Sequence, residues 1–221
     1  MSLSSPDRVT ALAGLATLDE PVRRRLYEYV SDAGRPVSRD EAAGAAGITR
    51  TLAAYHLDKL AEAGLLTTTY QRPAGRTGPG AGRPAKLYRP AEQELAVSVP
   101  PRAYELLARL LAQAAESDTT GTVRSTLHGV AHDVGRQIST KAGGDLMTAL
   151  RGGGYQPHAG PDGGIELLNC PFHRLAQEHR DLVCGLNLRL IEGVITESTR
   201  PQARAELEPS PGRCCVVVRG A

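Results

Sequence analysis

The stretch from Ser38 to Pro90 constrains the fold of this chain more than any other part of it. Ser38 is a residue type that caps helices, and Glu41 three positions later can complete a capping box. The helix that begins there is predicted to end at Ala46. Gly47 then supplies a turn whose backbone geometry disfavours a β-carbon. The spacing therefore predicts a short helix followed by a tight turn.

A second helix is predicted directly after this turn, with Thr49 as its cap and Gly64 at its end. Three apolar residues recur at i, i+4 and i+7 and share one buried face: Ala53, Leu57 and Leu60. The start of the helix and its other faces carry the side chains that a DNA-reading helix presents to the major groove. The predicted DNA contacts here are Thr49, Arg50, Thr51, Tyr55, His56 and Lys59.

A basic hairpin follows the second helix. Residues 67–72 and 86–88 suit two short strands, and the loop between them is rich in glycine. The hairpin contains basic residues and no acidic residue between positions 72 and 89: Arg72, Arg76, Arg83, Lys86 and Arg89. We expect Arg76, Arg83 and Lys86 to contact the DNA backbone or a narrow minor groove, the alternative being a solvated hairpin without a ligand. The order of elements predicts a winged helix-turn-helix that binds double-stranded DNA.

The charge of the chain is distributed in keeping with this prediction. The 221 residues carry a net charge of +2. Residues 1–90 hold 13 basic and 9 acidic residues, whereas residues 91–221 hold 13 and 15. The positive half is the half with the helix-turn-helix, which suits a polyanionic partner. No apolar run is long enough to span a membrane and no secretory signal begins the chain, so we expect a cytoplasmic protein without membrane contact.

Residues 91–150 are predicted to form a helical linker. Two apolar stripes at helical spacing occur in it, made of Ala103, Leu106, Leu107, Leu110, Leu111 and Ala114, and of Val123, Leu127, Val130, Ala131, Val134 and Ile138. Such helices are predicted to carry the contact of a homodimer, and the alternative is that they pack on their own domain. His128 and His132 stand four residues apart and could clasp a metal ion, but no glutamate completes an HExxH pattern.

The remaining residues predict a small domain of helices and strands. Residues 152–170 suit two strands joined by a turn at Asp162–Gly163, and a mostly helical segment follows. Residues 203–208 and 214–218 suit a closing pair of strands. The predicted fold class is α+β. Its three parts are a winged helix-turn-helix DNA-binding domain at 1–90, a helical linker and dimerisation region at 91–150, and a cysteine-containing α+β sensor domain at 151–221.

All four cysteines lie in the last quarter of the chain: Cys170, Cys184, Cys214 and Cys215. Three separate elements contribute these thiols, namely a strand end, a helix and a C-terminal strand. Soft thiolates suit zinc or an iron–sulfur cluster, and His173 and His179 are further candidate ligands. The alternative is that the cysteines are small buried apolar residues. In a strand, neighbouring side chains point to opposite faces, so we expect only one member of the Cys214–Cys215 doublet to face a site.

Two segments resemble a known family. NCPFHRLAQEHRDLVCGLNLRLIEGV and PGRCCVVV, behind a winged helix ending GRPAKLYRP, resemble the arsenic-repressor-like regulators, and among them the repressors of iron–sulfur cluster assembly. The resemblance covers roughly residues 19–90 and 150–218. It implies a dimeric DNA-binding repressor that holds an iron–sulfur cluster, of the 4Fe-4S type, through Cys170, Cys184 and one of Cys214 and Cys215. The family pattern has one cysteine in the last strand, so the doublet leaves that ligand open, and no fourth ligand is evident.

Two other functions are compatible with these residues. The C-terminal domain of a DNA-binding regulator could hold zinc or a small organic effector in place of a cluster. The chain could also be an enzyme with Cys170 as nucleophile and His173 or His179 as base, but no orienting group or oxyanion hole is evident. We therefore expect a regulator, most simply a repressor, and not an enzyme.

Overall fold

A computed structural model describes residues 5–71, 84–92, 94–98, 102–160, 163–210 and 212–220. The chain divides into two compact units, Met1–Arg102 and Ala103–Ala221. The predicted linker at 91–150 is therefore divided: residues up to Arg102 belong to the first unit, and those from Ala103 onward belong to the same unit as the C-terminal sheet. No helix among the described residues is long and apolar enough to cross a membrane.

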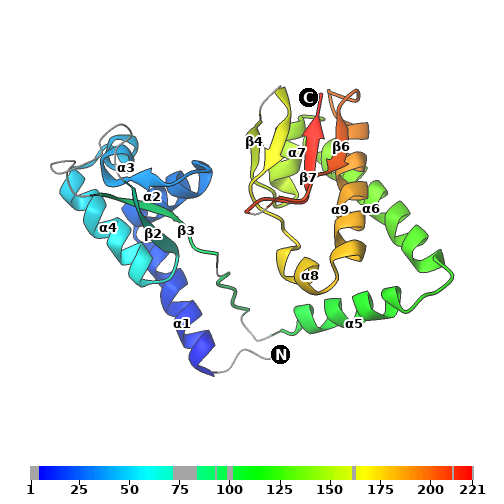
Figure 1. Cartoon of the computed structure of the whole chain (residues 1–221), viewed down its shortest axis with the longest axis horizontal. Helices are drawn as coiled ribbons and strands as arrows, with labels where there is room; N and C mark the ends of the chain where they lie inside the picture. Colours follow the sequence, from blue (N-terminus) through cyan, green and yellow to red (C-terminus); the bar gives the residue numbers. More distant parts are fainter. Residues whose placement is uncertain are drawn as a thin grey trace. The chain divides into compact units, whose positions relative to one another are not determined.

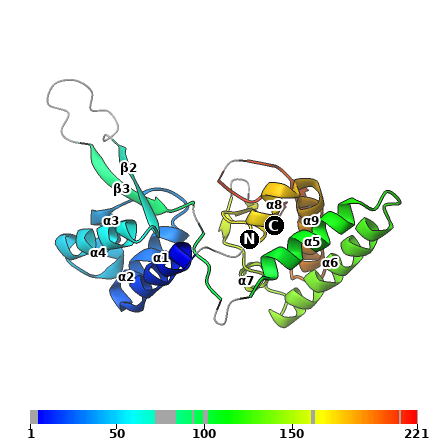
Figure 2. The same ribbon diagram turned by 90° about the horizontal axis from the view of Figure 1, so that it is seen from below.

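The first unit is a set of helices followed by a small antiparallel sheet (Figures 1 and 2). Its elements are α1 (Ser5–Ala16), a short 3-10 helix η1 (Thr17–Asp19), α2 (Pro21–Asp32), β1 (Val37–Ser38), α3 (Arg39–Ala46), α4 (Arg50–Glu62), β2 (Leu66–Gln71) and β3 (Ala85–Pro90). The strand order is β1-β3-β2, and Tyr88 of β3 is paired with both Val37 and Thr68. Three helices with this hairpin form the predicted winged helix-turn-helix.

The ends of α3 and α4 confirm the sequence signals. The Ser38 hydroxyl accepts a hydrogen bond from the Glu41 backbone N–H at 3.2 Å. Gly47 ends α3 in the left-handed region with φ 64°, which a residue with a β-carbon adopts only with strain. The Thr49 hydroxyl accepts from the Leu52 N–H at 3.3 Å and caps α4. Local capping thus sets the turn between the two helices.

Helix α2 is capped by Glu20, the residue before its first turn. The Glu20 carboxylate accepts hydrogen bonds from the N–H groups of Val22 at 3.0 Å and Arg23 at 2.7 Å. Pro21 occupies the first helical position, where its missing N–H has no cost. The core of this unit contains Leu26 and Val30 of α2 together with Val37, Leu57, Leu60 and Tyr88.

The second unit contains a helical layer and a four-stranded antiparallel sheet (Figures 1 and 2). Its elements are α5 (Tyr104–Glu116), α6 (Thr122–Lys141), α7 (Leu146–Gly152), β4 (Pro157–Ala159), β5 (Ile165–Leu167), α8 (His173–Glu178), α9 (Arg180–Thr196), β6 (Arg204–Leu207) and β7 (Val216–Arg219). The strand order is β4-β5-β7-β6. Both predicted strand pairs, β4 with β5 and β6 with β7, are present.

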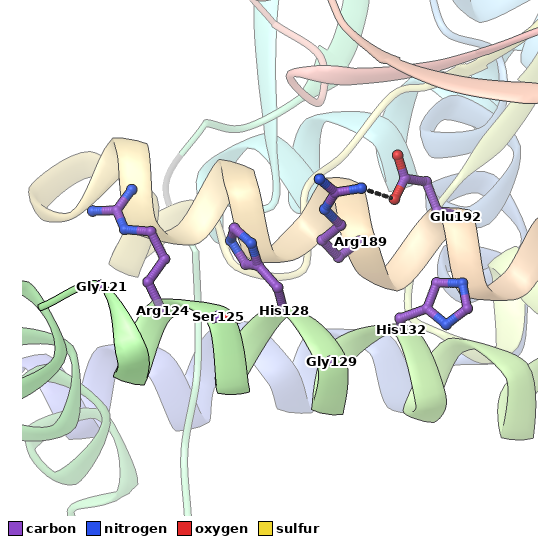
Figure 3. A pocket seen from close by; sticks show the side chains of 8 residues that line it. All are labelled: Gly121, Arg124, Ser125, His128, Gly129, His132, Arg189 and Glu192. Atoms are coloured by element: carbon purple, nitrogen blue, oxygen red, sulfur yellow. Dashed lines mark hydrogen bonds and ion pairs between the residues drawn. The ribbon is translucent and has the colours of Figure 1, made fainter.

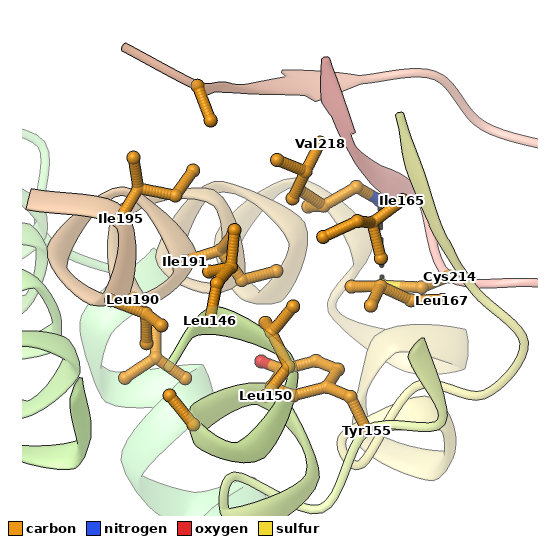
Figure 4. Close-up of a cluster of buried hydrophobic side chains, with 14 of the residues drawn as sticks. Leu146, Leu150, Tyr155, Ile165, Leu167, Leu190, Ile191, Ile195, Cys214 and Val218 are labelled. Carbon is orange, nitrogen blue, oxygen red and sulfur yellow. Dashed lines mark hydrogen bonds between the residues drawn. The ribbon is translucent and has the colours of Figure 1, made fainter. Parts of the chain in front are cut away.

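Helices α6 and α9 cross at two glycines. A β-carbon on Gly135 would lie 2.0 Å from the Leu190 carbonyl oxygen, and one on Gly193 would lie 2.0 Å from the His132 carbonyl oxygen. The two backbones therefore touch at a distance that only glycine permits. This crossing seats α9 against the core shown in Figure 4, where its apolar side chains meet those of α7, β5 and β7.

The apolar stripe of α5 is exposed within its own unit. Ala112 and Ala115 are the buried residues of this helix, whereas Leu107 is 54% exposed and Leu111 is 63% exposed. The other exposed large apolar residues of α5 and α6 are Tyr104, Leu106, Leu110, Val123, Val130 and Val134. The alternative that these leucines pack on their own domain is therefore not what the structure shows.

Candidate nucleic-acid interface and thiol site

Helix α4 presents a small exposed surface next to its capped start. Thr51 and Tyr55 are exposed there, and Leu52 between them is exposed as well. Leu52 was not among the predicted contacts. An exposed leucine on such a helix can contact the methyl group of a thymine, in the way that other apolar side chains do.

Two predicted cationic contacts of α4 are held in surface ion pairs. Arg50 Nε lies 2.7 Å from an Asp40 carboxylate oxygen, and Lys59 Nζ lies 2.7 Å from a Glu62 carboxylate oxygen. All four side chains are largely exposed. Exposed pairs of this kind contribute roughly 0–1 kcal/mol, so a phosphate can replace the carboxylate at little cost.

His56 lies in the interior, although it was grouped with the DNA contacts. It is 8% exposed, and its Nδ1 lies 3.6 Å from a Glu20 carboxylate oxygen. The physical reason is the helical period, since His56 precedes Leu60 by four positions and shares the buried face. Its side chain therefore joins α4 to the start of α2 and is absent from the exposed face.

The Lys86 side chain forms an ion pair with another residue of the first unit. Its Nζ lies 2.6 Å from an Asp58 carboxylate oxygen, and the Tyr88 hydroxyl donates to the same oxygen at 2.8 Å. Burial alone would raise the pKa of Asp58, but the hydrogen bonds from Lys86 and Tyr88 outweigh it and lower that pKa. Burial and the bond to Asp58 raise the pKa of Tyr88. The predicted contacts Arg76 and Arg83 lie outside the described residues.

Arg39 is a candidate that sequence reasoning missed. It is the first residue of α3, is exposed, and has no ion pair among the described residues. Its charge acts on both Asp58 and Tyr88, which places it beside the junction of α4 and β3. The sequence does contain a signal for Arg39: it directly follows the Ser38 cap, and a residue that follows an N-cap lies in the first helical turn.

The four cysteines come from three places in the second unit. Cys170 follows β5 and precedes α8, and Cys184 lies on α9. Cys214 and Cys215 lie just before β7, which begins at Val216. The expectation that strand alternation separates this doublet is therefore wrong, because the two residues are outside the regular strand.

The fold brings all four thiols together. Cys170 and Cys215 interact with Cys214, and Cys184 interacts with Cys215. The neighbouring thiols Cys170 and Cys215 lower the pKa of Cys214. The interaction with Cys214 and burial raise the pKa values of Cys170 and Cys215. The result is a connected thiol cluster, defined here as these four cysteines.

Polar groups of the core support the buried end of this thiol cluster. Asn187 is fully buried, and its Nδ2 donates a hydrogen bond to Cys214 Sγ at 3.2 Å. The Tyr155 hydroxyl donates to the side-chain oxygen of Asn187. The Val216 backbone N–H also faces Cys214 Sγ, at 3.5 Å. Cys214 is therefore held by donors from α9 and the polypeptide backbone, among the apolar side chains of Figure 4.

The histidines proposed as extra ligands or as a catalytic base have other partners. His173 Nε2 lies 3.0 Å from Gln177 Nε2 on the surface. His179 is buried, and its Nδ1 lies 2.7 Å from a Glu116 carboxylate oxygen. Among the described hydrogen bonds, neither imidazole is therefore bonded to the Cys170 thiol, although the His173 backbone N–H donates to the Cys170 carbonyl oxygen at 3.1 Å.

The donor atoms of the thiol cluster are of the kind that an iron–sulfur cluster or zinc prefers, but their arrangement is not that of a metal site. Four sulfur atoms from three elements converge, and soft thiolates are the ligands that these groups prefer. Within the described part of the chain, however, no three His, Cys, Asp or Glu side chains are placed to hold one metal ion. Binding such a group would require the thiols to reorient.

Residues 18–69 match the model of a family described as a helix-turn-helix domain. The match covers α2, α3 and α4 and supports a winged helix-turn-helix regulator of transcription that binds DNA. Searches of curated proteins and of solved structures found no match.

Proposed function

We propose that this chain is a dimeric transcriptional repressor whose second unit controls DNA binding through the thiol cluster. The helix-turn-helix match supports the DNA-binding half of this function. The convergence of all four cysteines in one place is the observation that carries the sensing half. We propose no catalytic role, since the described hydrogen bonds of the His173 and His179 side chains go to Gln177 and Glu116.

The first unit would insert α4 into the major groove. Thr51, Leu52 and Tyr55 would face the base edges, and Arg50 and Lys59 would exchange their surface carboxylates for phosphates. The hairpin of β2 and β3 would lie along the backbone or in the minor groove. Its orientation relative to α4 is held by Asp58, which binds both Lys86 and Tyr88 of β3.

The exposed leucines of α5 would form the contact between two copies. Monomeric proteins rarely leave large contiguous apolar patches in water, and burying a leucine contributes about 1.5–3 kcal/mol. Leu107 and Leu111 stand one helical turn apart, so they project on the same side of α5. A twofold dimer would place two recognition helices on a palindromic operator.

The thiol cluster would hold an iron–sulfur cluster, as the family resemblance implies. Such a cluster supplies a redox-sensitive centre whose loss or oxidation changes the thiols that bind it. Cys170, Cys184 and one of Cys214 and Cys215 would be its ligands. Zinc in the same position is the alternative, because it takes the same sulfur donors.

The corner between α8 and α9 would connect the thiols to the dimer contact. Cys170 lies three residues before α8, and Cys184 lies on the first turns of α9. At the corner itself, His179 binds Glu116 of α5. Arg109 of α5 also lies 3.0 Å from Glu178 of α8. A shift of α8 or α9 on thiol reorientation would therefore move the helix that carries the exposed leucines.

Anaerobic preparation of the full chain tests this function. We expect brown protein with iron and acid-labile sulfide, selective binding to an operator recovered from random DNA, and weaker binding after cluster loss. Cys184→Ser should lose the iron, whereas His173→Asn, a surface change, should retain it. Colourless zinc-loaded protein would support the alternative metal. DNA binding indifferent to the state of the thiols would refute the sensing role, and failure to select any DNA would refute the regulator.

A further inference from the structure

A groove between α6 and α9 is lined with basic side chains (Figure 3) and shares no residue with the thiol cluster. Its volume is about 550 Å³. The lining residues are Gly121, Arg124, Ser125, His128, Gly129, His132, Arg189 and Glu192. The close crossing at Gly135 and Gly193 holds the two walls of this groove in register. Two packed helices therefore position its side chains.

The groove has an excess of positive charge. Among the described residues that line it, Glu192 is the one acidic side chain, and a carboxylate oxygen of Glu192 lies 2.7 Å from Arg189 Nη1. Arg124, by contrast, has no ion pair among the described residues. In Figure 3, the Arg124 and His128 side chains rise from α6 toward α9, and Arg189 extends from α9. The groove thus contains the unpaired guanidinium of Arg124 and the paired one of Arg189, and this excess of positive charge favours the binding of an anion.

His128 contributes a donor to this groove. Its Nε2 is buried without a hydrogen-bond partner, and a β-carbon on Gly185 would meet that atom at 3.3 Å. Burial is the first cause that lowers the pKa of His128, followed by Arg189 and Arg124, with Glu192 opposing them. Nδ1 is not among the buried atoms without a partner, and a ring with a proton on this nitrogen presents an N–H. That N–H is available to an acceptor in the groove.

A cation suits this groove less well than an anion. His128 and His132 have the i, i+4 spacing of a two-histidine metal site, but His132 Nε2 lies 3.4 Å from the Thr196 hydroxyl. Arg124 and Arg189 would repel a divalent ion at close range. Within the described ranges, no group of three ligating side chains is arranged around a metal position.

We propose that the α6–α9 groove binds a small oxyanion, a phosphate or carboxylate group of an effector molecule, through Arg124, His128 and Arg189. Arg124 would supply a charge-assisted pair, and His128 would add one N–H from the helix wall. Arg189 would be shared between the ligand and Glu192. Gly129 leaves open space for the rest of the ligand, since a β-carbon there would meet nothing within 4 Å.

Histidine-detected NMR of the full chain, with inorganic phosphate or acetate added at constant ionic strength, tests this site. We expect phosphate to shift the His128 resonances in a saturable way and to raise the pKa of His128, because a bound anion favours the charged ring. Arg124→Gln should weaken that binding about tenfold, the usual effect of losing a charged hydrogen bond. Arg151→Gln, on α7 outside the groove, is the matched control and should bind as the wild type does.

The comparison of phosphate with acetate separates the ligand classes. Saturation by phosphate alone identifies a phosphorylated effector, and saturation by both anions identifies an oxyanion site that also accepts carboxylates. A filling variant, Gly129→Leu, should weaken binding while the protein keeps its thermal unfolding transition. Equal affinity in Arg124→Gln and the wild type, or a linear shift that never saturates, would overturn the proposal.

Discussion

The Tyr88 hydroxyl donates a 2.8 Å hydrogen bond to the Asp58 carboxylate and joins the hairpin to the recognition helix. Tyr88 is 1% exposed and stands at the centre of the three-stranded sheet, paired with β1 and β2. Asp58 faces it from the third turn of α4 and binds Lys86 as well. One carboxylate thus sets the relative orientation of two elements that would contact DNA together.

Asp58→Ala should destabilise the first unit by about 1–3 kcal/mol, because it leaves the buried Tyr88 hydroxyl without an acceptor. Thermal unfolding followed by circular dichroism measures the loss. Asp58→Asn keeps an acceptor for Tyr88 and should cost less. Equal loss in both variants would contradict a role for the Tyr88 hydrogen bond.

The same carboxylate predicts the direction of a pH dependence. The pKa of Asp58 is lowered in the folded protein, so its stabilising contribution is present above the ordinary aspartate pKa of about 4. The contribution is lost as the pH falls through the folded value. Unfolding curves between neutral pH and pH 3 should converge for the wild type and Asp58→Asn. A difference that grows on acidification would contradict this assignment.

Arg50→Gln and Tyr55→Ala should weaken operator binding in different ways. Losing a phosphate contact should lower the salt slope of the affinity by about one. Losing a base contact should cost about 1–3 kcal/mol of discrimination and leave the salt slope unchanged. Fluorescence anisotropy at several salt concentrations separates the two, and each variant is the control for the other. Identical salt slopes would remove Arg50 from the interface.

Leu107→Glu and Leu111→Glu should convert a dimer to monomers. Each change places a charge in the middle of the apolar surface that two copies would bury. Sedimentation velocity measures the mass, and Gln113→Glu adds the same charge to an exposed polar position of α5 as the control. A wild-type chain that sediments as a monomer at all concentrations would refute this interface.

Glu116→Ala should reduce the response of DNA affinity to the thiols. The change removes the partner of a buried histidine at the α8–α9 corner and loosens the link between that corner and α5. The ratio of operator affinities before and after thiol oxidation should approach one. Asp133→Ala, an exposed carboxylate of α6, is the control and should keep the wild-type ratio. A response that is equal in all three proteins would exclude this route.

Two glycines of one helix should respond oppositely to alanine. Gly135→Ala forces a β-carbon into the Leu190 carbonyl of α9 and should destabilise the second unit by several kcal/mol. Gly129→Ala meets nothing within 4 Å and should stabilise α6 by about 0.5–1 kcal/mol. Chemical denaturation of both variants checks the pair. Similar effects at both positions would contradict the described crossing of α6 and α9.

Local signals in the amino-acid sequence were sufficient for the helix-turn-helix. These signals act within a few residues, so they can be recognised without knowledge of the fold. They are the Ser38 and Thr49 caps, the Gly47 turn and the period of Ala53, Leu57 and Leu60. The two strand pairs of the second unit were legible for the same reason. Arg76 and Arg83 stay predictions, because they lie outside the described residues.

Tertiary structure alone decided the rest. Cys170, Cys184 and the Cys214–Cys215 doublet meet because β5, α9 and the segment before β7 converge, and no local period encodes that convergence. The exposure of Leu111 depends likewise on which neighbours cover its face of α5. Periodicity shows that a helix has an apolar side, but only packing decides whether that side meets its own core or water.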